Sequence, residues 1–407
     1  MSIERLELTG LPFATQFEWL VSLKGAGTRA AAKFRTLASE TPVDGGVARL
    51  VVASCYYDDV LFGPQARAYG ETLKSMAQPV DLKLLVGDNL YLDVARDQRS
   101  IWGGWEETAH RYRHYFWESE AYADALSQQA NLTTWDDHEF WNNYPERQFW
   151  LERTSDEWRP EYDEAGQAFL ETFQNSLNLL PGSSSIRTHE YVTPACSIFL
   201  ADTRTQRSSI NRLRPWMMAQ TEFQALLTWL GSLTEPGVLV LGQPLWHSRG
   251  SRFDYAPIDF EDQFGRLWAA LKECKADVLV VSGDVHHSRV LQIDCGDGVM
   301  LHEFVSSPAV HIPSGWSIFR QKYNSQGKGS IGYPKTLTIP RSGSNLPWFK
   351  PTVSKCFAST NLPNTIGELV LRRIPQGDDA ALIVEAAFWD TLKRRRLQPC
   401  SFMLRTR

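Results

Sequence analysis

The sequence has no segment that would carry the chain into or through a membrane. Its 407 residues contain no apolar run of about 18 residues, the length that a membrane-spanning helix needs. A secretory signal begins with a basic region followed by an apolar stretch, and residues 1–7 do not show this pattern. We therefore expect a cytoplasmic protein with no membrane span.

Cysteine is scarce and scattered. The six cysteines stand singly, with no CxxC pair among them. This spacing argues against a zinc knuckle and against a disulfide framework. Cys55 stands with Ser54 at the end of an apolar run and is a candidate for chemistry. We expect the other five to be buried thiols, namely Cys196, Cys274, Cys295, Cys356 and Cys400.

Basic residues do not gather along the chain. The formal net charge is −5, and residues 393–396 (KRRR) are the one basic run. Because nucleic-acid backbones require clustered Lys and Arg, we expect no dedicated nucleic-acid partner. We interpret the run as a solvated turn between two terminal strands, with a patch for an anionic ligand as the alternative.

Apolar residues, at 43% of the chain, are numerous enough for a large core. Residues 1–46 alternate apolar and polar side chains between glycine turns, which predicts a small β-rich N-terminal appendage. In residues 47–407, short apolar runs and amphipathic stretches predict one α/β domain. Strands are expected at 50–53, 82–86, 197–201, 238–241 and 278–281, helices at 220–233 and 260–274, and a terminal antiparallel pair at 367–374 and 381–389.

Three stretches interrupt this pattern. Residues 100–130 carry aromatic side chains on a helical pattern, which fits either a packing surface or a contact with substrate. Residues 141–160 are polar and aromatic and fit a loop over a site. Residues 307–360 contain many glycines and prolines, so we expect a loop-rich segment there.

Polar residues follow nearly every predicted strand. The carboxyl ends of strands in an open α/β sheet border a common crevice, so these side chains are expected to converge. Buried charges need a compensating partner, and a cation is the simplest one for so many ionisable groups. The strand ends are Ser54-Cys55, Gly87-Asp88, Asp136-Asp137-His138-Glu139, Asp202-Thr203-Arg204, Gly242-Gln243 and Ser282 to His287.

Cys55, Asp88 and Tyr91 suit an iron site. Gly87 lets the backbone turn sharply, so that Asp88 can project into the crevice and bridge two cations. A thiolate, a phenolate and a carboxylate together suit iron better than magnesium or calcium. The alternatives are that Cys55 is a small core residue and that Tyr91 only packs.

The run from Asp136 to Glu139 offers groups for metal binding and for catalysis. Asp137 can bind a second metal, and His138 can stabilise charge or give a proton to a leaving oxygen. Asp136 and Glu139 can orient the metal ligands. A core histidine with satisfied hydrogen bonds is the alternative for His138.

Asp284 and His286 form a second candidate pair. We expect them to alternate along extended backbone, so that both side chains point to one face and reach adjacent metals. His287 would then point elsewhere, and we interpret it as structural.

Together these motifs resemble the PhoD-like alkaline phosphatase and phosphodiesterase family, a branch of the calcineurin-like metallophosphoesterases. The resemblance extends from about Phe34 to Trp389 and implies an αββα sandwich. The motifs that carry it are Ser54-Cys55, Gly87-Asp88-x-x-Tyr91, Trp135-Asp136-Asp137-His138-Glu139-Phe140-x-Asn142-Asn143, Asp202-x-Arg204 and Ser282-Gly283-Asp284-Val285-His286-x-Ser288.

The resemblance implies a binuclear metal centre. Cys55, Asp88 and Tyr91 would hold Fe³⁺, and Asp88 and Asp137 would hold a divalent ion, which is Ca²⁺ in the family's best-understood type. The chain lacks the twin-arginine export signal of the family's exported members. Metal supply inside a cell differs, so Mn²⁺, Zn²⁺ or Mg²⁺ are alternatives for the site.

The resemblance also assigns residues around the metals. Asp284 and His286 stand where the superfamily has metal ligands, and Gln243 stands near a further histidine position, which leaves its role open. His138 would act on the leaving group. The residues implied to contact the phosphate or the substrate are Arg204, Arg207 and Asn142, and an ion pair with Asp202 is the alternative for Arg204.

These expectations lead to one principal function and two alternatives. The principal one is a metal-dependent phosphoric-ester hydrolase acting on a small-molecule phosphate ester. Two metals would lower the pKa of a bound water from about 16 to about 7, and the hydroxide would attack phosphorus in line. The alternatives are a metal-binding regulatory or interaction protein with weak or no catalysis, and a structural protein whose aromatic segment binds a partner.

Overall fold

The described strands assemble into two seven-stranded sheets and one two-stranded sheet. Parallel strands alternate with helices along the chain, which confirms the predicted α/β class. The computed structural model describes residues 6, 8–23, 27–58, 63–94, 103–178, 187–250, 254–311, 333–339, 349–376 and 379–407.

The first large sheet has three parallel strands and an antiparallel extension. β3, β4 and β5 are parallel, so their carboxyl ends lie at one edge of the sheet. β13 pairs antiparallel with β3, and β14 joins β13 to β15 and β16. These strands are β3 (Val47–Ala53), β4 (Leu82–Val86), β5 (Ala130–Thr134), β13 (Thr365–Gln376), β14 (Asp379–Asp390), β15 (Arg395–Arg396) and β16 (Cys400–Arg405).

The second large sheet has the order β12-β10-β11-β9-β8-β7-β6. β7, β8, β9 and β11 are parallel, while β6, β10 and β12 are antiparallel to their neighbours. The strands are β6 (His189–Val192), β7 (Ser197–Leu200), β8 (Gly237–Val240), β9 (Val278–Ser282), β10 (Ser288–Asp294), β11 (Met300–Val305) and β12 (Thr352–Thr360).

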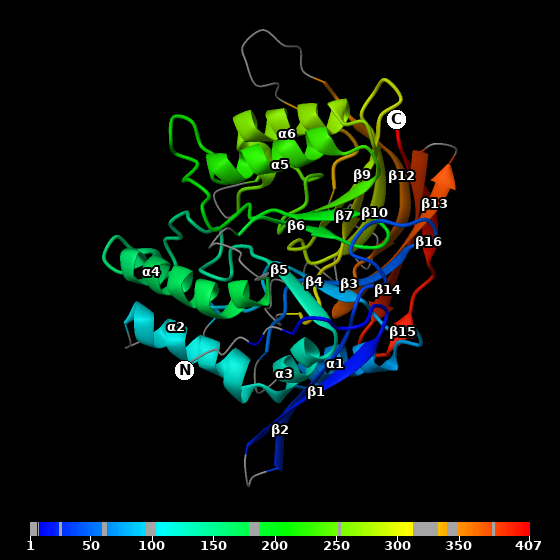
Figure 1. Ribbon diagram of the computed structural model, residues 1–407. Coiled ribbons are helices and arrows are strands. Elements are labelled where there is room, and N and C mark those ends of the chain that lie inside the picture. The colour runs from blue at the N-terminus through cyan, green and yellow to red at the C-terminus, as the bar shows by residue number, and fades with distance from the viewer. Residues whose placement is uncertain are drawn as a thin grey trace.

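The two sheets share an apolar core, and helices cover their other faces. Leu50 and Val52 of the first sheet lie in one cluster with Val240 and Val281 of the second. Figure 1 shows α5 and α6 beyond the second sheet, and α1, α2 and α3 on the opposite side of the molecule. Buried residues of α5 and α6 pack with strands of the second sheet, and those of α1, α2 and α3 pack with strands of the first, as in a layered domain.

The helices are α1 (Gly63–Ser75), α2 (Gly104–Arg113), α3 (Glu120–Ser127), α4 (Arg159–Phe169), α5 (Gln220–Ser232) and α6 (Glu261–Glu273). Two π-helical turns, η1 (His114–Glu118) and η3 (Leu170–Gln174), extend α2 and α4. Short 3₁₀ turns are η2 (Glu152–Thr154), η4 (Asn175–Leu177) and η5 (Pro257–Asp259).

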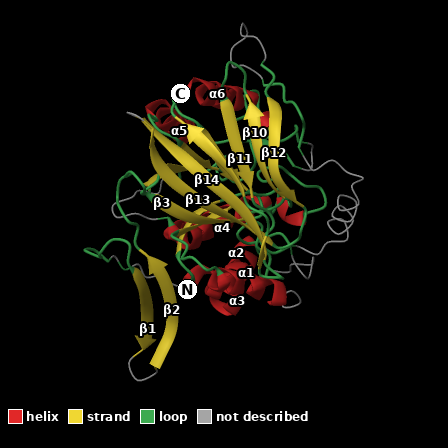
Figure 2. Cartoon of the chain, turned by 90° about the vertical axis from the view of Figure 1, so that its right-hand side faces the viewer, coloured by secondary structure: helices red, strands yellow, loops and turns green. Residues whose placement is uncertain are grey.

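The N-terminal strands β1 (Gln16–Leu23) and β2 (Gly27–Arg35) form a sheet of their own. Figure 2 shows this pair extending away from the two large sheets. The end of β2 is tied to the main body, because Gln129 N donates to Lys33 O at 2.6 Å and Arg35 pairs with Asp81 at 3.3 Å. The division into an appendage (1–46) and a main domain (47–407) stays a prediction.

Most predicted element positions agree with the structure. β3, β4, β7, β8 and β9 lie at the predicted strand positions, α5 and α6 at the predicted helix positions, and β13 and β14 form the terminal pair. In the segment 307–360, however, Thr352–Thr360 forms the edge strand β12 where a loop was expected. Residues 312–332 and 340–348 of that segment, and residues 100–102 of the aromatic segment, lie outside the described residues.

The six cysteines are free, as the spacing predicted. The prediction of five buried thiols is wrong for Cys356, which is exposed, and for Cys400, which is half-buried. Cys356 lies on the edge strand β12 and Cys400 begins β16, where one side of the strand faces solvent. Among the described helices, none is long and apolar enough to cross a membrane.

Candidate metal centre

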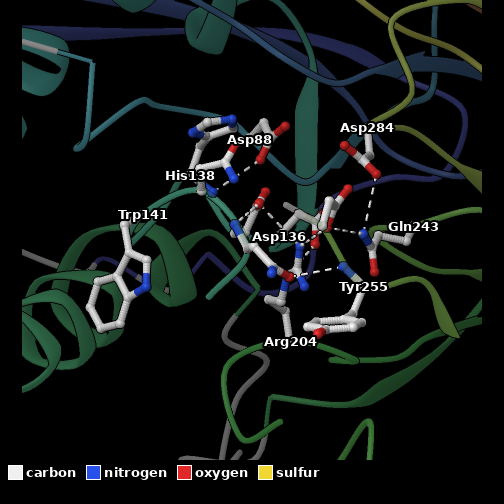
Figure 3. Close-up of polar contacts among 12 residues, drawn as sticks. Asp88, Asp136, His138, Trp141, Arg204, Gln243, Tyr255 and Asp284 are labelled. Carbon is white, nitrogen blue, oxygen red and sulfur yellow. Dashed lines mark hydrogen bonds and ion pairs between the residues drawn. The ribbon is translucent and has the colours of Figure 1, made fainter. Parts of the chain in front are cut away.

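Four carboxylates meet where the carboxyl ends of the parallel strands of both sheets face each other. Asp88 follows β4, Asp136 and Asp137 follow β5, and Asp284 follows β9. One carboxylate oxygen from each lies within 4.8 Å of the others. Asp88, Asp137 and His138 form a second such group. The predicted convergence of strand ends is therefore present for these five side chains, several of which Figure 3 shows.

The backbone around the centre adopts left-handed conformations at non-glycine residues. The φ angles are +56° at Cys55, +52° at Asp88, +60° at Asn143, +66° at Asp284 and +53° at His286. Such residues cost about 1–3 kcal/mol each and persist where the surrounding structure holds them, often at functional sites. The prediction of extended backbone from Asp284 to His286 is wrong, because this segment turns tightly and His286 N donates to Asp284 O at 2.8 Å.

Cys55 lies beside the carboxylates. Its thiol donates to Asp88 Oδ2 at 3.3 Å and lies 3.2 Å from Ser307 Oγ. Burial, together with Asp88 and Asp284, raises the pKa of the Cys55 thiol. Without a neighbouring cation, therefore, this sulfur is a thiol rather than the thiolate that binds metals.

Tyr91 is fully buried and packs in one small cluster with Cys55. Its hydroxyl has no hydrogen-bond partner among the described residues. Burial raises the pKa of Tyr91, with further contributions from Cys55 and Asp88. A buried hydroxyl without a partner is costly, so this oxygen needs a partner that the described residues do not supply, such as a metal ion.

His138 is held between a carboxylate and an aromatic ring. Its Nδ1 lies 2.7 Å from Asp93 Oδ1, and its ring centroid is 4.3 Å from that of Tyr91. Its backbone N–H donates to Asp88 Oδ1 at 3.3 Å. Burial alone would lower the pKa of His138, but Asp93, Asp137 and Asp88 raise it above its ordinary value. The sequence reading missed Asp93, although it stands two residues after Tyr91.

Glu139 joins the two loops that carry the aspartates. Its Oε2 accepts hydrogen bonds from Asp88 N at 3.0 Å and Asp136 N at 2.9 Å, and its Oε1 accepts one from Asn89 N at 2.6 Å. Glu139 is fully buried. This geometry agrees with the predicted supporting role, because the backbone of both loops depends on one side chain.

Arg204 is fully buried among carboxylates. Its Nε lies 2.6 Å from Asp136 Oδ1, and its Nη2 lies 3.2 Å from Asp137 Oδ2 and 3.5 Å from Asp254 Oδ1. The alternative ion pair with Asp202 is not formed. Asp202 Oδ1 instead accepts hydrogen bonds from the backbone N–H groups of Arg204 and Thr205 at 3.0 and 2.9 Å.

Gln243 links Arg207 to Asp284. Arg207 Nη2 donates to Gln243 Oε1 at 2.8 Å, and Gln243 Nε2 donates to Asp284 Oδ2 at 3.2 Å. Because arginine can only donate, the amide oxygen of Gln243 must face Arg207 and its NH₂ group must face Asp284. Gln243 therefore orients Asp284, a candidate metal ligand, and the Gln243 amide oxygen points away from Asp284.

His286, Asn142 and His287 stand outside the two groups of candidate metal ligands. His286 N donates to Ser307 Oγ at 3.0 Å, and its ring lies 5.4 Å from the ring of His311. Asn142 N donates to Asp93 Oδ2 at 2.9 Å. His287 Nε2 lies 2.6 Å from the buried Arg289, in line with its predicted structural role.

The centre concentrates negative charge in a buried space. Burial raises the pKa of Asp88, Asp136 and Asp284, and neighbouring carboxylates raise each pKa further. Asp137 Oδ1, like the Tyr91 hydroxyl, has no hydrogen-bond partner among the described residues. Carboxylates packed this closely favour a bound cation, because repulsion and lost hydration both disfavour their charged forms.

Comparisons with known proteins find similarity to phosphatases. Residues 50–234 match the sequence profile of a family described as PhoD-like phosphatase. The solved structure of PhoD is similar to this chain, with a TM-score of 0.56, 15% identity, and coverage of 93% of this chain and 73% of that one. No curated protein sequence matches the chain.

A second similar structure is the purple acid phosphatase PPD1 from yellow lupin (Lupinus luteus) seeds. Its TM-score is 0.54 at 12% identity, and the match covers 95% of this chain and 59% of that one. At such low identities, the two structural matches show a shared α/β fold and nothing finer.

Proposed function

We propose that this chain, whose residues 50–234 match the PhoD-like phosphatase family, is a metal-dependent phosphoric-ester hydrolase with two metal ions at the centre. The observation that carries the proposal is the group of Asp88, Asp136, Asp137 and Asp284, whose carboxylate oxygens lie within 4.8 Å of one another. The first three of these residues lie in the part of the chain that matches the family.

The side chains fit the expected ions. Cys55, Tyr91 and Asp88 offer sulfur, phenolate and carboxylate donors, which suit Fe³⁺. Asp88, Asp137 and Asp284 offer ligands for a divalent ion, for which we propose Ca²⁺, with Mn²⁺, Zn²⁺ and Mg²⁺ as alternatives. His286, which stands outside this group, remains a proposed ligand. The ions, when bound, would attract the phosphate oxygens and lower the pKa of a water from about 16 to about 7.

Asp136 adds to this set. The sequence reading gave it a supporting role, whereas its carboxylate lies within ligand distance of the other three. Its partner Arg204 holds Asp136 and Asp137 in place through Nε and Nη2. We therefore propose that Asp136 either binds a metal directly or sets the position of Asp137.

The chain's own groups would act on the ester as follows. His138, oriented by Asp93, would stabilise or protonate the leaving oxygen. Arg204 pairs with carboxylates through Nε and Nη2, so Nη1 is its proposed donor to a phosphate oxygen. Arg207 and Asn142 remain proposed substrate contacts.

The fold supports the proposal at the level of architecture. We propose that the two sheets and the helices on their outer faces form the αββα sandwich of calcineurin-like metallophosphoesterases. Residues 1–46 would form a separate β-rich appendage beside the domain of residues 47–407.

The experiment is hydrolysis of aryl phosphate monoesters and diesters by the purified protein, with its metals measured by elemental analysis. Asp88→Asn and Asp137→Asn should each abolish turnover and lower the metal content. Asp297→Asn, at an exposed aspartate that pairs with Lys272, is the matched control and should change neither. Full turnover by either variant in a metal-loaded state would contradict the mechanism, whereas metal binding without turnover in the wild type would favour the regulatory alternative.

A further inference from the structure

Three polar side chains form a buried group that contacts the segment from Leu92 to Val94. Glu107 of α2, Arg153 of η2 and Tyr162 of α4 are each almost fully buried. Arg153 Nη2 donates to Glu107 Oε1 at 2.7 Å, and the Tyr162 hydroxyl donates to Glu107 Oε2. The Arg153 guanidinium also lies over the Tyr162 ring, 4.9 Å from its centroid. We call Glu107, Arg153 and Tyr162 the clamp.

The clamp holds a backbone segment that belongs to the centre. Arg153 Nη1 donates to Leu92 O at 2.6 Å, and Leu92 N donates to His138 O at 3.0 Å. Two residues further on, Arg111 Nη2 donates to Val94 O at 2.8 Å. Between these anchored peptides lies Asp93, the residue whose carboxylate orients His138.

We propose that Arg153 is a positioning residue, which fixes Asp93 and thereby the His138 ring through its bond to the Leu92 carbonyl. The inference rests on the proposed function, because it concerns the residue expected to act on the leaving oxygen. A guanidinium suits this task, since its planar fork can reach a carbonyl and a carboxylate at the same time.

The proposal also gives the aromatic segment a role. Sequence reasoning left residues 100–130 open between packing and contact with substrate. In α2, Arg111 binds the Val94 carbonyl directly, and Glu107 binds Arg153, which in turn binds the Leu92 carbonyl. α2 packs tightly on α4, since a Cβ on Gly104 would lie 2.9 Å from Tyr162 N. α2 is therefore a scaffold for the loop that carries Leu92, Asp93 and Val94.

The hydrogen bond from Arg153 to the Leu92 carbonyl distinguishes a residue that positions His138 from one that only stabilises the fold. A buried ion pair is by itself weak evidence for stability, because desolvation of both charges opposes their attraction. Arg153 would satisfy Glu107 with one end of its fork alone. The second end lies on the carbonyl of a peptide whose N–H is bonded to His138, so movement of Arg153 is transmitted to the centre.

The test compares Arg153→Lys with Arg147→Lys. Lysine keeps the charge at position 153 but has no fork to bridge Leu92 and Glu107. Arg147 lies on the same loop in an exposed ion pair with Asp156, which makes its variant the control. In Arg153→Lys, kcat on an aryl phosphodiester should fall by about 10- to 100-fold with KM and metal content unchanged. Amide hydrogen exchange of a peptide covering residues 88–94 should rise, and the control should match the wild type in all readouts.

A second variant guards against a general loss of folding. Tyr162→Phe removes one hydrogen bond to Glu107 and should produce a smaller change in the same readouts. If wild-type protein hydrolyses the ester and Arg153→Lys keeps its kcat and its exchange rates, the clamp has no positioning role. If the wild type hydrolyses no phosphate ester, the proposed function fails, while unchanged exchange at residues 88–94 would separately overturn the clamp.

Discussion

Glu139→Gln tests whether one buried carboxylate holds the two metal-binding loops together. In the native structure Glu139 accepts three backbone N–H groups, from Asp88, Asn89 and Asp136. Glutamine has one oxygen and one NH₂ group, so it can accept at only one of the two positions. In the more favourable orientation of the glutamine amide, its oxygen accepts from the N–H groups of Asp88 and Asp136, and its NH₂ group faces the N–H of Asn89, which loses its acceptor.

The cost follows from these contacts. Burial raises the pKa of Glu139 to about 7, so the comparison is made above this pH, where the carboxylate is charged. There, loss of a hydrogen bond to a charged group costs about 1.5–3 kcal/mol, and an unsatisfied buried N–H adds about 1–3 kcal/mol. After partial relaxation we expect the variant to lose about 3 kcal/mol of unfolding free energy in denaturant titrations, together with part of its metal content. Glu157→Gln, at an exposed position of the same chain, is the control and should behave as wild type. Equal unfolding midpoints for the two variants would refute the reasoning, because the hydrogen bonds of Glu139 to the two loops would then not stabilise the fold.

Three further predictions concern the orienting carboxylate, bound metal and pH. Asp93→Asn should lower kcat far more than KM on an aryl phosphodiester, because His138 loses its charged partner; equal effects on both would speak against orientation. Chelation should lower the thermal unfolding temperature, since a ligand bound only by the folded state stabilises it, and re-addition of metal should restore it; an unchanged temperature would mean that no metal is held. Burial raises the pKa of Glu222 from 4.5 to about 7, so the wild type loses stability as pH rises through this window. The stability of Glu222→Gln relative to wild type should therefore increase from about pH 5 to about pH 8, by at most about 3 kcal/mol, and a constant difference in denaturant titrations would contradict the shift.

Local pattern was sufficient for most of the elements. The runs that became β4 and β9 consist of buried apolar residues, and α6 has its buried side chains at helical spacing, so these elements could be located from sequence. β12 could not, because its residues are mostly exposed or half-buried and the strand depends on pairing with β10 at the sheet edge. A strand with no buried face has no apolar alternation to reveal it.

The resemblance to the PhoD-like family was also readable from the chain, because the motifs that carry it stand directly after predicted strands. The match over residues 50–234 confirms that resemblance. The backbone at Asp284 and His286 shows where such reading stops. Both residues have positive φ, a conformation set by bonds from Asp284 N to Ser54 and from His286 N to Ser307. Nothing in the local letters Asp-Val-His distinguishes this turn from an extended strand.

The sequence by itself determined which ionisable side chains stand at the ends of strands, and hence that Asp88, Asp137 and His138 would meet. The reason is that parallel strands of a sheet end at one edge, so local order along the chain is enough. Only the tertiary structure decided the partners of these groups. Asp93 reaches His138 across 45 positions and Arg153 reaches Leu92 across 61, and such contacts depend on how helices and loops pack, not on the residues next to them.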